Sequence, residues 1–212
     1  MSVPRLSLFR PLMLLGLSAL ALAGCQRNPL VIKRSPCPAV ATPIYANDMT
    51  LFYPGTAPDA ANMDVVASIT NLRGACTEGT AQLVSDVSYQ VVARRTDTRG
   101  ARAVQLPVFA SVVQGGNLLV SKQISSVTLN FADGTERAVA AGTARATVDR
   151  AAASLPERVQ RIINRKRKPG DPDAAVDPLA DPEVRAALRA ASFEVLLGFQ
   201  LSEQQLAYNV TK

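Results

Sequence analysis

Residues 193–201 have the sequence FEVLLGFQL, in which every second side chain is apolar. The apolar series is Phe193, Val195, Leu197, Phe199 and Leu201. Successive side chains of a β-strand point to opposite sides, so a period of two predicts a strand with one face turned to a core. Glu194 falls in the other series and is expected on the solvated face. Ser202 and Gln205 then have the spacing of a capping box, which predicts a short terminal helix that packs Leu206 on the sheet.

The same alternation recurs along the chain before this strand. Strands are predicted at residues 64–72, 87–94, 103–113, 117–123, 125–131 and 137–148, with turns at 71–74, 115–116 and 133–134. Many short strands joined by tight turns are typical of an antiparallel β-sandwich, here of immunoglobulin-like architecture. The chain contains no tryptophan, so the likeness to immunoglobulin domains concerns architecture and not their Cys…Trp…Cys signature.

Residues 154–192 interrupt the β pattern and predict a short two-helix excursion before the C-terminal strand. Ser154 and Glu157 have capping-box spacing, and the apolar residues that follow recur as one face of a helix. Asp181-Pro182 predicts the start of a second helix, because proline is favoured in the first helical turn. We therefore expect a mainly β protein with this helical and acidic insertion.

The first of these helices is basic, and the segment after it is acidic. Residues 154–169 carry a net charge of +5 and residues 170–183 a net charge of −5. The basic residues are Arg158, Arg161, Arg165, Lys166, Arg167 and Lys168. They predict a surface for anionic lipid, lipopolysaccharide or peptidoglycan. The alternative is an amphipathic helix whose charges are solvated or paired with the adjoining acids, and the cancelling net charges favour this alternative.

Near the N-terminus, Leu22-Ala23-Gly24-Cys25 follows two arginines and an apolar run at residues 12–22. This segment resembles the lipobox of bacterial lipoproteins. The resemblance implies that the Cys25 thiol receives a diacylglycerol, that cleavage just before Cys25 removes residues 1–24, and that its amino group is then acylated. The alternative is an uncleaved transmembrane helix, but the run has roughly half of the 20 or so apolar residues that a bilayer requires.

The lipobox resemblance also implies how the chain is divided and where it is located. Residues 1–24 would be a signal peptide, residues 25–36 an acylated tether, and residues 37–212 a single sandwich domain that contains the 154–192 insertion. Gln26 stands where lipoproteins of the inner membrane often carry Asp, so we expect a lipid anchor in the periplasmic leaflet of the outer membrane. The stretch from Cys37 to Asn209 is similar to uncharacterised conserved lipoproteins of alphaproteobacteria, for instance at residues 69–74 and 198–201, and this resemblance implies no activity.

Once Cys25 is lipidated, Cys37 and Cys76 are the two cysteines left in an oxidising compartment, which predicts a disulfide between them. A redox dithiol is the alternative, but such cysteines usually lie two residues apart.

The chain contains no histidine. Ser-His-Asp and Cys-His catalysis is therefore excluded, as is a zinc site with imidazole ligands. We expect no catalytic residue, metal or cofactor, and the mild net charge disfavours nucleic acid as a partner. The sequence predicts a non-enzymatic envelope lipoprotein, anchored to the membrane through Cys25, that interacts or assembles with an envelope protein. The first alternative is binding of an anionic surface by the basic helix, and the second is a histidine-free envelope hydrolase with a carboxylate pair.

Overall fold

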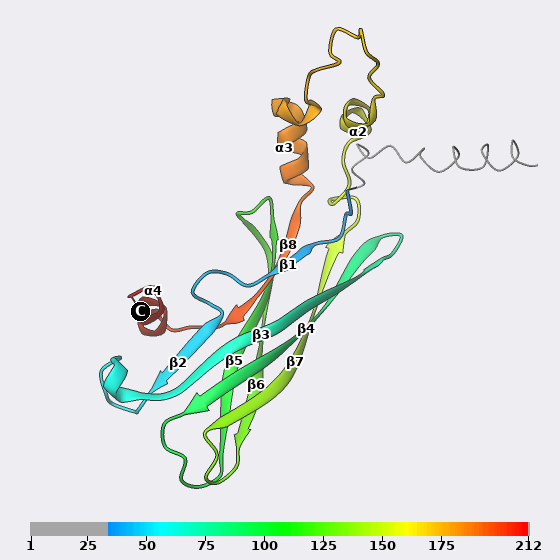
Figure 1. The fold of residues 1–212 in the computed structure, drawn as a ribbon. Coiled ribbons are helices and arrows are strands. Elements are labelled where there is room, and N and C mark those ends of the chain that lie inside the picture. The colour runs from blue at the N-terminus through cyan, green and yellow to red at the C-terminus, as the bar shows by residue number, and fades with distance from the viewer. Residues whose placement is uncertain (1–33, 212) are drawn as a thin grey trace, which may run out of the picture. The chain divides into compact units, whose positions relative to one another are not determined.

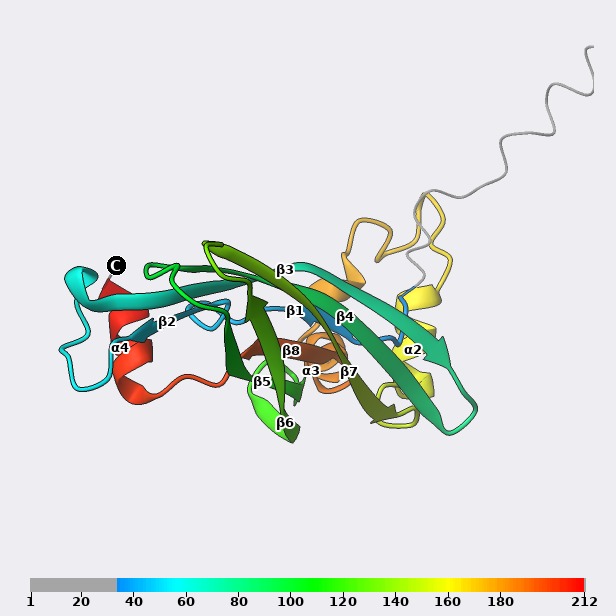
Figure 2. The same cartoon turned by 90° about the horizontal axis from the view of Figure 1, so that it is seen from below.

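The structure, a computed structural model, describes residues 34–211. Ser35–Lys212 is one compact unit, and nearly half of its described residues lie in two four-stranded sheets. The sheets face each other as the two layers of a β-sandwich (Figures 1 and 2). Buried side chains from both sheets form one hydrophobic core between them. The predicted mainly β sandwich is therefore confirmed.

Sheet A has the strand order β1–β8–β5–β6, and sheet B has the order β2–β3–β4–β7. The bounds are β1 Ala39–Ala41, β2 Asp48–Phe52, β3 Met63–Glu78, β4 Gln82–Arg95, β5 Arg102–Gln114, β6 Leu118–Phe131, β7 Arg137–Asp149 and β8 Phe193–Phe199. Neighbouring strands are antiparallel except β1, which runs parallel to β8. Three consecutive strands, β2 to β4, are neighbours in one sheet, unlike the immunoglobulin order, so the likeness is architectural.

The C-terminal strand β8 is the core strand that its period of two predicts. Its alternate side chains Phe193, Val195, Leu197 and Phe199 are buried. In sheet B, β4 buries the corresponding series, which includes Val87, Tyr89 and Val91. Tyr89 lies directly over Gly142 of β7, where an added Cβ would overlap the ring. Glycine at this position lets β7 approach the aromatic side chain that fills the space between the sheets.

Strand β3 is longer than the sequence predicts, and the expected turn at residues 71–74 is wrong. The pairing of β3 with β4 shifts between Thr70 and Arg73 and then continues to Glu78. Asn71 adopts a left-handed conformation with φ 51°, which asparagine tolerates better than most residues. The polar segment is therefore a bulge, and the strand continues because β4 is long enough to pair with both halves.

The two strands predicted at 117–123 and 125–131 form one strand, β6. It pairs with β5 without a break at this point, since Ile124 lies opposite Phe109 and Ser125 opposite Val108. The alternation is weak here because residues 118–126 of β6 are exposed on both faces. A strand at the edge of a sheet needs less apolar alternation than one inside it, and the sequence pattern alone does not reveal its continuity.

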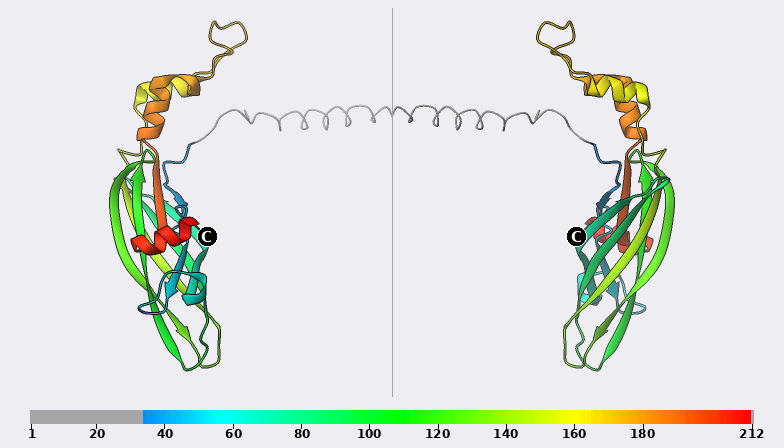
Figure 3. Two further views of the ribbon diagram at one scale, coloured as in Figure 1. Left: turned by 90° about the vertical axis from the view of Figure 1, so that its left-hand side faces the viewer. Right: turned by 90° about the vertical axis from the view of Figure 1, so that its right-hand side faces the viewer.

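The two-helix excursion is present at one end of the sandwich (Figure 3). It consists of α2 (Glu157–Asn164), the short helix η2 (Pro178–Ala180) and α3 (Pro182–Ala190). Asp181 caps α3 as predicted, by accepting hydrogen bonds from the backbone of Glu183 and Val184. The capping box at Ser154 is wrong, because its hydroxyl donates to the carbonyl of Arg150 and Pro156 becomes the N-cap of α2.

The terminal helix α4 (Glu203–Thr211) begins with the predicted capping box. Gln205 donates its backbone N–H to Ser202 Oγ, and Ser202 donates its own to Gln205 Oε1. Leu206, expected on the sheet, is exposed instead. The packing of α4 comes from Tyr208 and from buried Asn209. The Tyr208 and Phe52 rings are edge-on to each other, with 5.0 Å between their centres. Another short helix, η1 (Ala60–Asn62), precedes β3.

Among residues 34–211, no helix combines the length and the apolar character that crossing a membrane requires.

Candidate functional site

The predicted disulfide joins Cys37 to Cys76, with their Cα atoms 6.1 Å apart. Cys76 lies near the end of β3, and Cys37 precedes β1, whose Ala39 pairs with Glu194 at the start of β8. The start of the described chain is therefore tied to sheet B by a covalent bond and to sheet A by backbone pairing. Cys25, the signal peptide and residues 25–33 of the tether lie outside the described residues, so lipid attachment stays a prediction.

The six basic residues predicted as a binding surface do not form one free cationic face. Each of the four arginines has an acidic partner. The pairs are Arg158 with Glu183 at 3.1 Å, Arg161 with Glu157 at 3.5 Å, Arg165 with Asp173 at 3.0 Å and Arg167 with Asp173 at 3.5 Å. Lys166 and Lys168 are exposed and form no ion pair within residues 34–211. The acidic segment thus folds back on α2 through Glu183 and on the basic residues after α2 through Asp173.

The other aspartates of the acidic segment have structural partners. Asp177 and Asp181 each accept hydrogen bonds from backbone N–H groups at the start of η2 and α3. Asp171 accepts one from the backbone of Lys168. Carboxylates are favourable at helix starts because they satisfy backbone donors that have no partner inside the helix. The four aspartates of this segment therefore have structural roles as caps and ion-pair partners.

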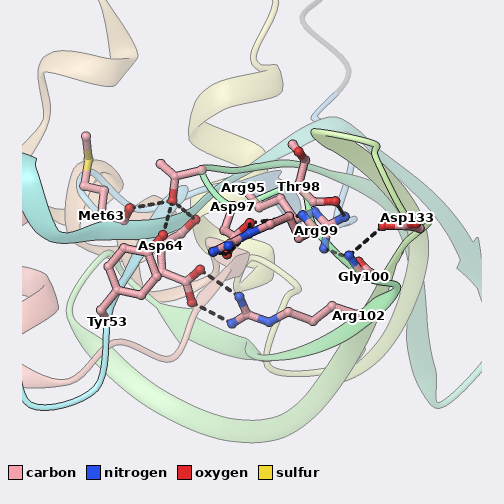
Figure 4. Close-up of polar contacts among 11 residues, drawn as sticks. Tyr53, Met63, Asp64, Arg95, Asp97, Thr98, Arg99, Gly100, Arg102 and Asp133 are labelled. Carbon is pink, nitrogen blue, oxygen red and sulfur yellow. Dashed lines mark hydrogen bonds and ion pairs between the residues drawn. The ribbon is translucent and has the colours of Figure 1, made fainter.

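A polar cluster lies at the opposite end of the sandwich, where β3 meets β5 (Figure 4). Both carboxylate oxygens of Asp64 accept hydrogen bonds from Arg102, at 2.7 and 2.6 Å. The Asp64 side chain is only 6% exposed, and this bonding raises the pKa of the Arg102 guanidinium. Nearby, the exposed Arg99 guanidinium holds the pKa of Asp97 well below its usual range, mainly through a side-chain hydrogen bond.

Arg95 is buried beside this cluster, and its side chain forms no hydrogen bond or close ion pair with a carboxylate among the described residues. Its guanidinium donates to the backbone oxygens of Thr98, Gly100, Ala132 and Thr135, and it lies 5.2 Å from the centre of the Phe131 ring. These oxygens belong to two loops, β4–β5 and β6–β7, so Arg95 holds both loops in place. The sequence analysis missed this role, although Arg95 is in phase with the inward series of β4 two residues after Ala93.

Two pockets lie on the surface of the described chain. The first, about 410 Å³, lies beside Arg102 and is also lined by Tyr53, Gln204 and Gln205. The second, about 600 Å³, lies on the outer face of sheet B, where Asp86 pairs with Arg145 at 2.6 Å. Each of these two pockets contains one carboxylate, and each carboxylate is bound to an arginine. A glycosidase-type mechanism requires two carboxyl groups on either side of the bond that is cleaved.

The outer face of sheet A carries apolar residues on three neighbouring strands. Phe109 and Val113 come from β5, Leu119 and Ile124 from β6, and Leu196 from β8; we call these five residues the sheet A patch. Strand register places Phe109 opposite Ile124 and Val113 opposite Leu119. Ile124 is 63% exposed and Leu119 is 56% exposed. Phe109, Val113 and Leu196 are half-buried, and Ser111 and Lys122 lie between the two pairs, so the patch is open to solvent mainly along β6.

The outer face of sheet B differs from this patch. Along β4 and β7 it is mostly polar, although Val92 and Val139 form an exposed pair. The polar residues are Asp86, Ser88, Gln90, Arg94, Arg137, Thr143, Arg145 and Thr147. A sheet that faces water on one side normally has polar residues there, as sheet B does. The sheet A patch departs from this rule and is the best candidate for an interaction site.

Comparison with protein-family models, with curated proteins and with solved structures found no match to this chain.

Proposed function

We propose that this protein is a lipid-anchored lipoprotein of the bacterial envelope whose sandwich is a non-enzymatic interaction or assembly module. The observation that carries the interaction role is the sheet A patch. Single apolar side chains are common on protein surfaces, whereas contiguous apolar patches mark sites that another molecule covers. None of the five side chains in the patch is charged, so covering them breaks no ion pair.

The anchor and its location are supported by other features of the chain. The segment from Leu22 to Cys25 supports acylation of Cys25, and Gln26 supports the periplasmic leaflet of the outer membrane as the destination. Disulfides persist in oxidising compartments such as the periplasm, so the bond between Cys37 and Cys76 supports a location outside the cytoplasm.

The interaction role is tested by site-specific photocrosslinking in cells that make the full chain. A photoreactive residue in place of Ile124 should give one discrete protein crosslink. The control position is Thr147, which is exposed on the outer face of sheet B and should give none. The crosslink should weaken in the Cys25→Ala variant, because loss of the anchor lowers the local concentration of the module. Similar labelling at both positions would remove the support for the patch as an interaction site.

Binding of an anionic surface is a second candidate function. It is favoured by Lys166 and Lys168, which are exposed and hold no ion pair among the described residues. Each cation near an anionic membrane contributes about 1 kcal/mol, so two lysines alone support weak binding. We rank this function below protein interaction, because the four arginines of the same segment are already paired with acids.

A further inference from the structure

The face of sheet A that carries the patch also holds one cation and one anion, on opposite sides of the central strand β5. Lys122 lies on β6 opposite Ser111 of β5, and Glu194 lies on β8 opposite Val113 of β5. Within residues 34–211, neither side chain takes part in an ion pair. The Lys122 ammonium lies 4.9 Å from the centre of the Phe109 ring, so it is held over the patch. A partner that covers the patch therefore meets a positive flank and a negative flank.

This charge arrangement is self-complementary. If a second copy packs its own patch against the first, with the two-fold axis along β5, β6 of each copy lies over β8 of the other. Packed sheets are about 10 Å apart, and Lys122 and Glu194 differ by two residues along the strand direction, or about 7 Å. Their Cα atoms would then be about 12 Å apart, a separation that extended lysine and glutamate side chains bridge. A two-fold axis across the strands would instead place β6 of one copy over β6 of the other. Lys122 would then face the equivalent strand of the second copy and not Glu194.

We infer that the sheet A patch is an isologous dimer interface, in which Lys122 of each copy pairs with Glu194 of the other and the five apolar side chains are buried between them. This inference rests on the proposed interaction role and names a second copy of the chain as the occupant. Closed two-fold dimers use the same surface on both subunits, and such a surface must supply both charges of each pair itself. The sheet A patch does so.

The size of the patch indicates how strong this dimer is. Three strands with about 4.8 Å between neighbours and about five residues along each strand give a contact of a few hundred Å² per copy. A stable interface usually buries about 800 Å² per partner, so dimerisation in dilute solution is weak. A shared membrane anchor raises the effective concentration of the modules and shifts the equilibrium towards the dimer.

Charge reversal tests the inference. The chain from Ser35, which contains the whole core and both disulfide cysteines, is studied by sedimentation equilibrium up to high micromolar concentration. The unaltered chain should show a monomer–dimer equilibrium. Lys122→Glu alone and Glu194→Lys alone should each weaken it about tenfold, because each variant places like charges at both symmetric contacts. An equimolar mixture of the two variants should recover the affinity of the unaltered chain, since every cross-contact then joins opposite charges.

The matched control is Arg137→Glu, the same change of charge on the outer face of sheet B, which should leave the equilibrium unaltered. Recovery in the mixture also shows that both reversed variants are folded. A chain that stays monomeric throughout, or a mixture that does not recover, would overturn the inference. If the chain is monomeric but Ile124 crosslinks a different protein in cells, the dimer is wrong and the interaction role stands; if both experiments fail, both proposals fall.

Discussion

At the scale of single residues, Arg95 shows how backbone oxygens can hold a buried charge. Its side chain is 1% exposed and satisfies four backbone oxygens of two loops. Arg95→Met should lower the free energy of unfolding by about 3 kcal/mol, because buried carbonyl groups lose their donors. Urea denaturation of the chain from Ser35 measures the change.

The preceding residue provides the control for this prediction. Arg94 lies on the same strand but points outward, is 70% exposed and pairs with Glu136 on the surface. Arg94→Met should cost less than about 1 kcal/mol, because solvent screens an exposed ion pair. Equal losses in the two variants would show that Arg95 does not hold the loops.

At the scale of elements, the acidic residues that follow α2 set the exposed charge of this helix and of the basic residues at its C-terminal end. Asp173 binds Arg165 and Arg167, and Glu183 binds Arg158. The double variant Asp173→Asn/Glu183→Gln should bind phosphatidylglycerol-containing vesicles at least about tenfold more tightly than the unaltered chain at low salt, and the gain should shrink at high salt. Vesicle sedimentation measures the binding.

The control for this experiment removes two acids elsewhere. Asp86→Asn/Glu136→Gln frees Arg145 and Arg94 on sheet B and changes the net charge equally. If the position of the freed cations decides binding, this control should bind vesicles less tightly than Asp173→Asn/Glu183→Gln. If only the net charge decides binding, the two variants should bind equally. Strong, salt-sensitive binding by the unaltered chain would instead make surface binding the leading function.

At the scale of the whole molecule, the disulfide closes a loop of 39 residues from the segment before β1 to the end of β3. The chain-entropy model assigns such a loop about 4 kcal/mol. Cys37→Ala/Cys76→Ala should therefore lower the urea midpoint of the chain from Ser35, with a loss of that order. Addition of a reductant should lower the midpoint of the unaltered chain similarly and leave the double variant unchanged. An unaltered midpoint after complete reduction would contradict this prediction.

The lipid anchor is also a property of the whole molecule. When cells make the full chain, the mass of the protein extracted from membranes should equal that of residues 25–212 plus a diacylglyceryl group on the thiol and one acyl chain on the amino group. Cys25→Ala should abolish both the cleavage and the acylation, because the thiol is the acceptor that the lipobox resemblance implies. A soluble mature form without lipid in cells that make the unaltered chain would contradict the anchor.

The sequence by itself determined the features that depend on neighbouring residues. The period of two in β8 identified a core strand, since a half-buried strand needs no information beyond its own alternation. The caps at Asp181 and Ser202 were likewise recognised, because a cap involves residues within one helical turn. The same local rule failed at Ser154, where the carbonyl of Arg150 competes successfully for the hydroxyl.

Only the tertiary structure decided the features that depend on residues far apart in the chain. The bulge at Asn71 exists because β4 pairs with both halves of β3, and β6 is continuous because β5 lies beside it. The sheet A patch brings together residues from β5, β6 and β8, more than 70 positions apart at its extremes. Strand register sets these neighbours, and register follows from the pairing of whole strands, which no local pattern encodes.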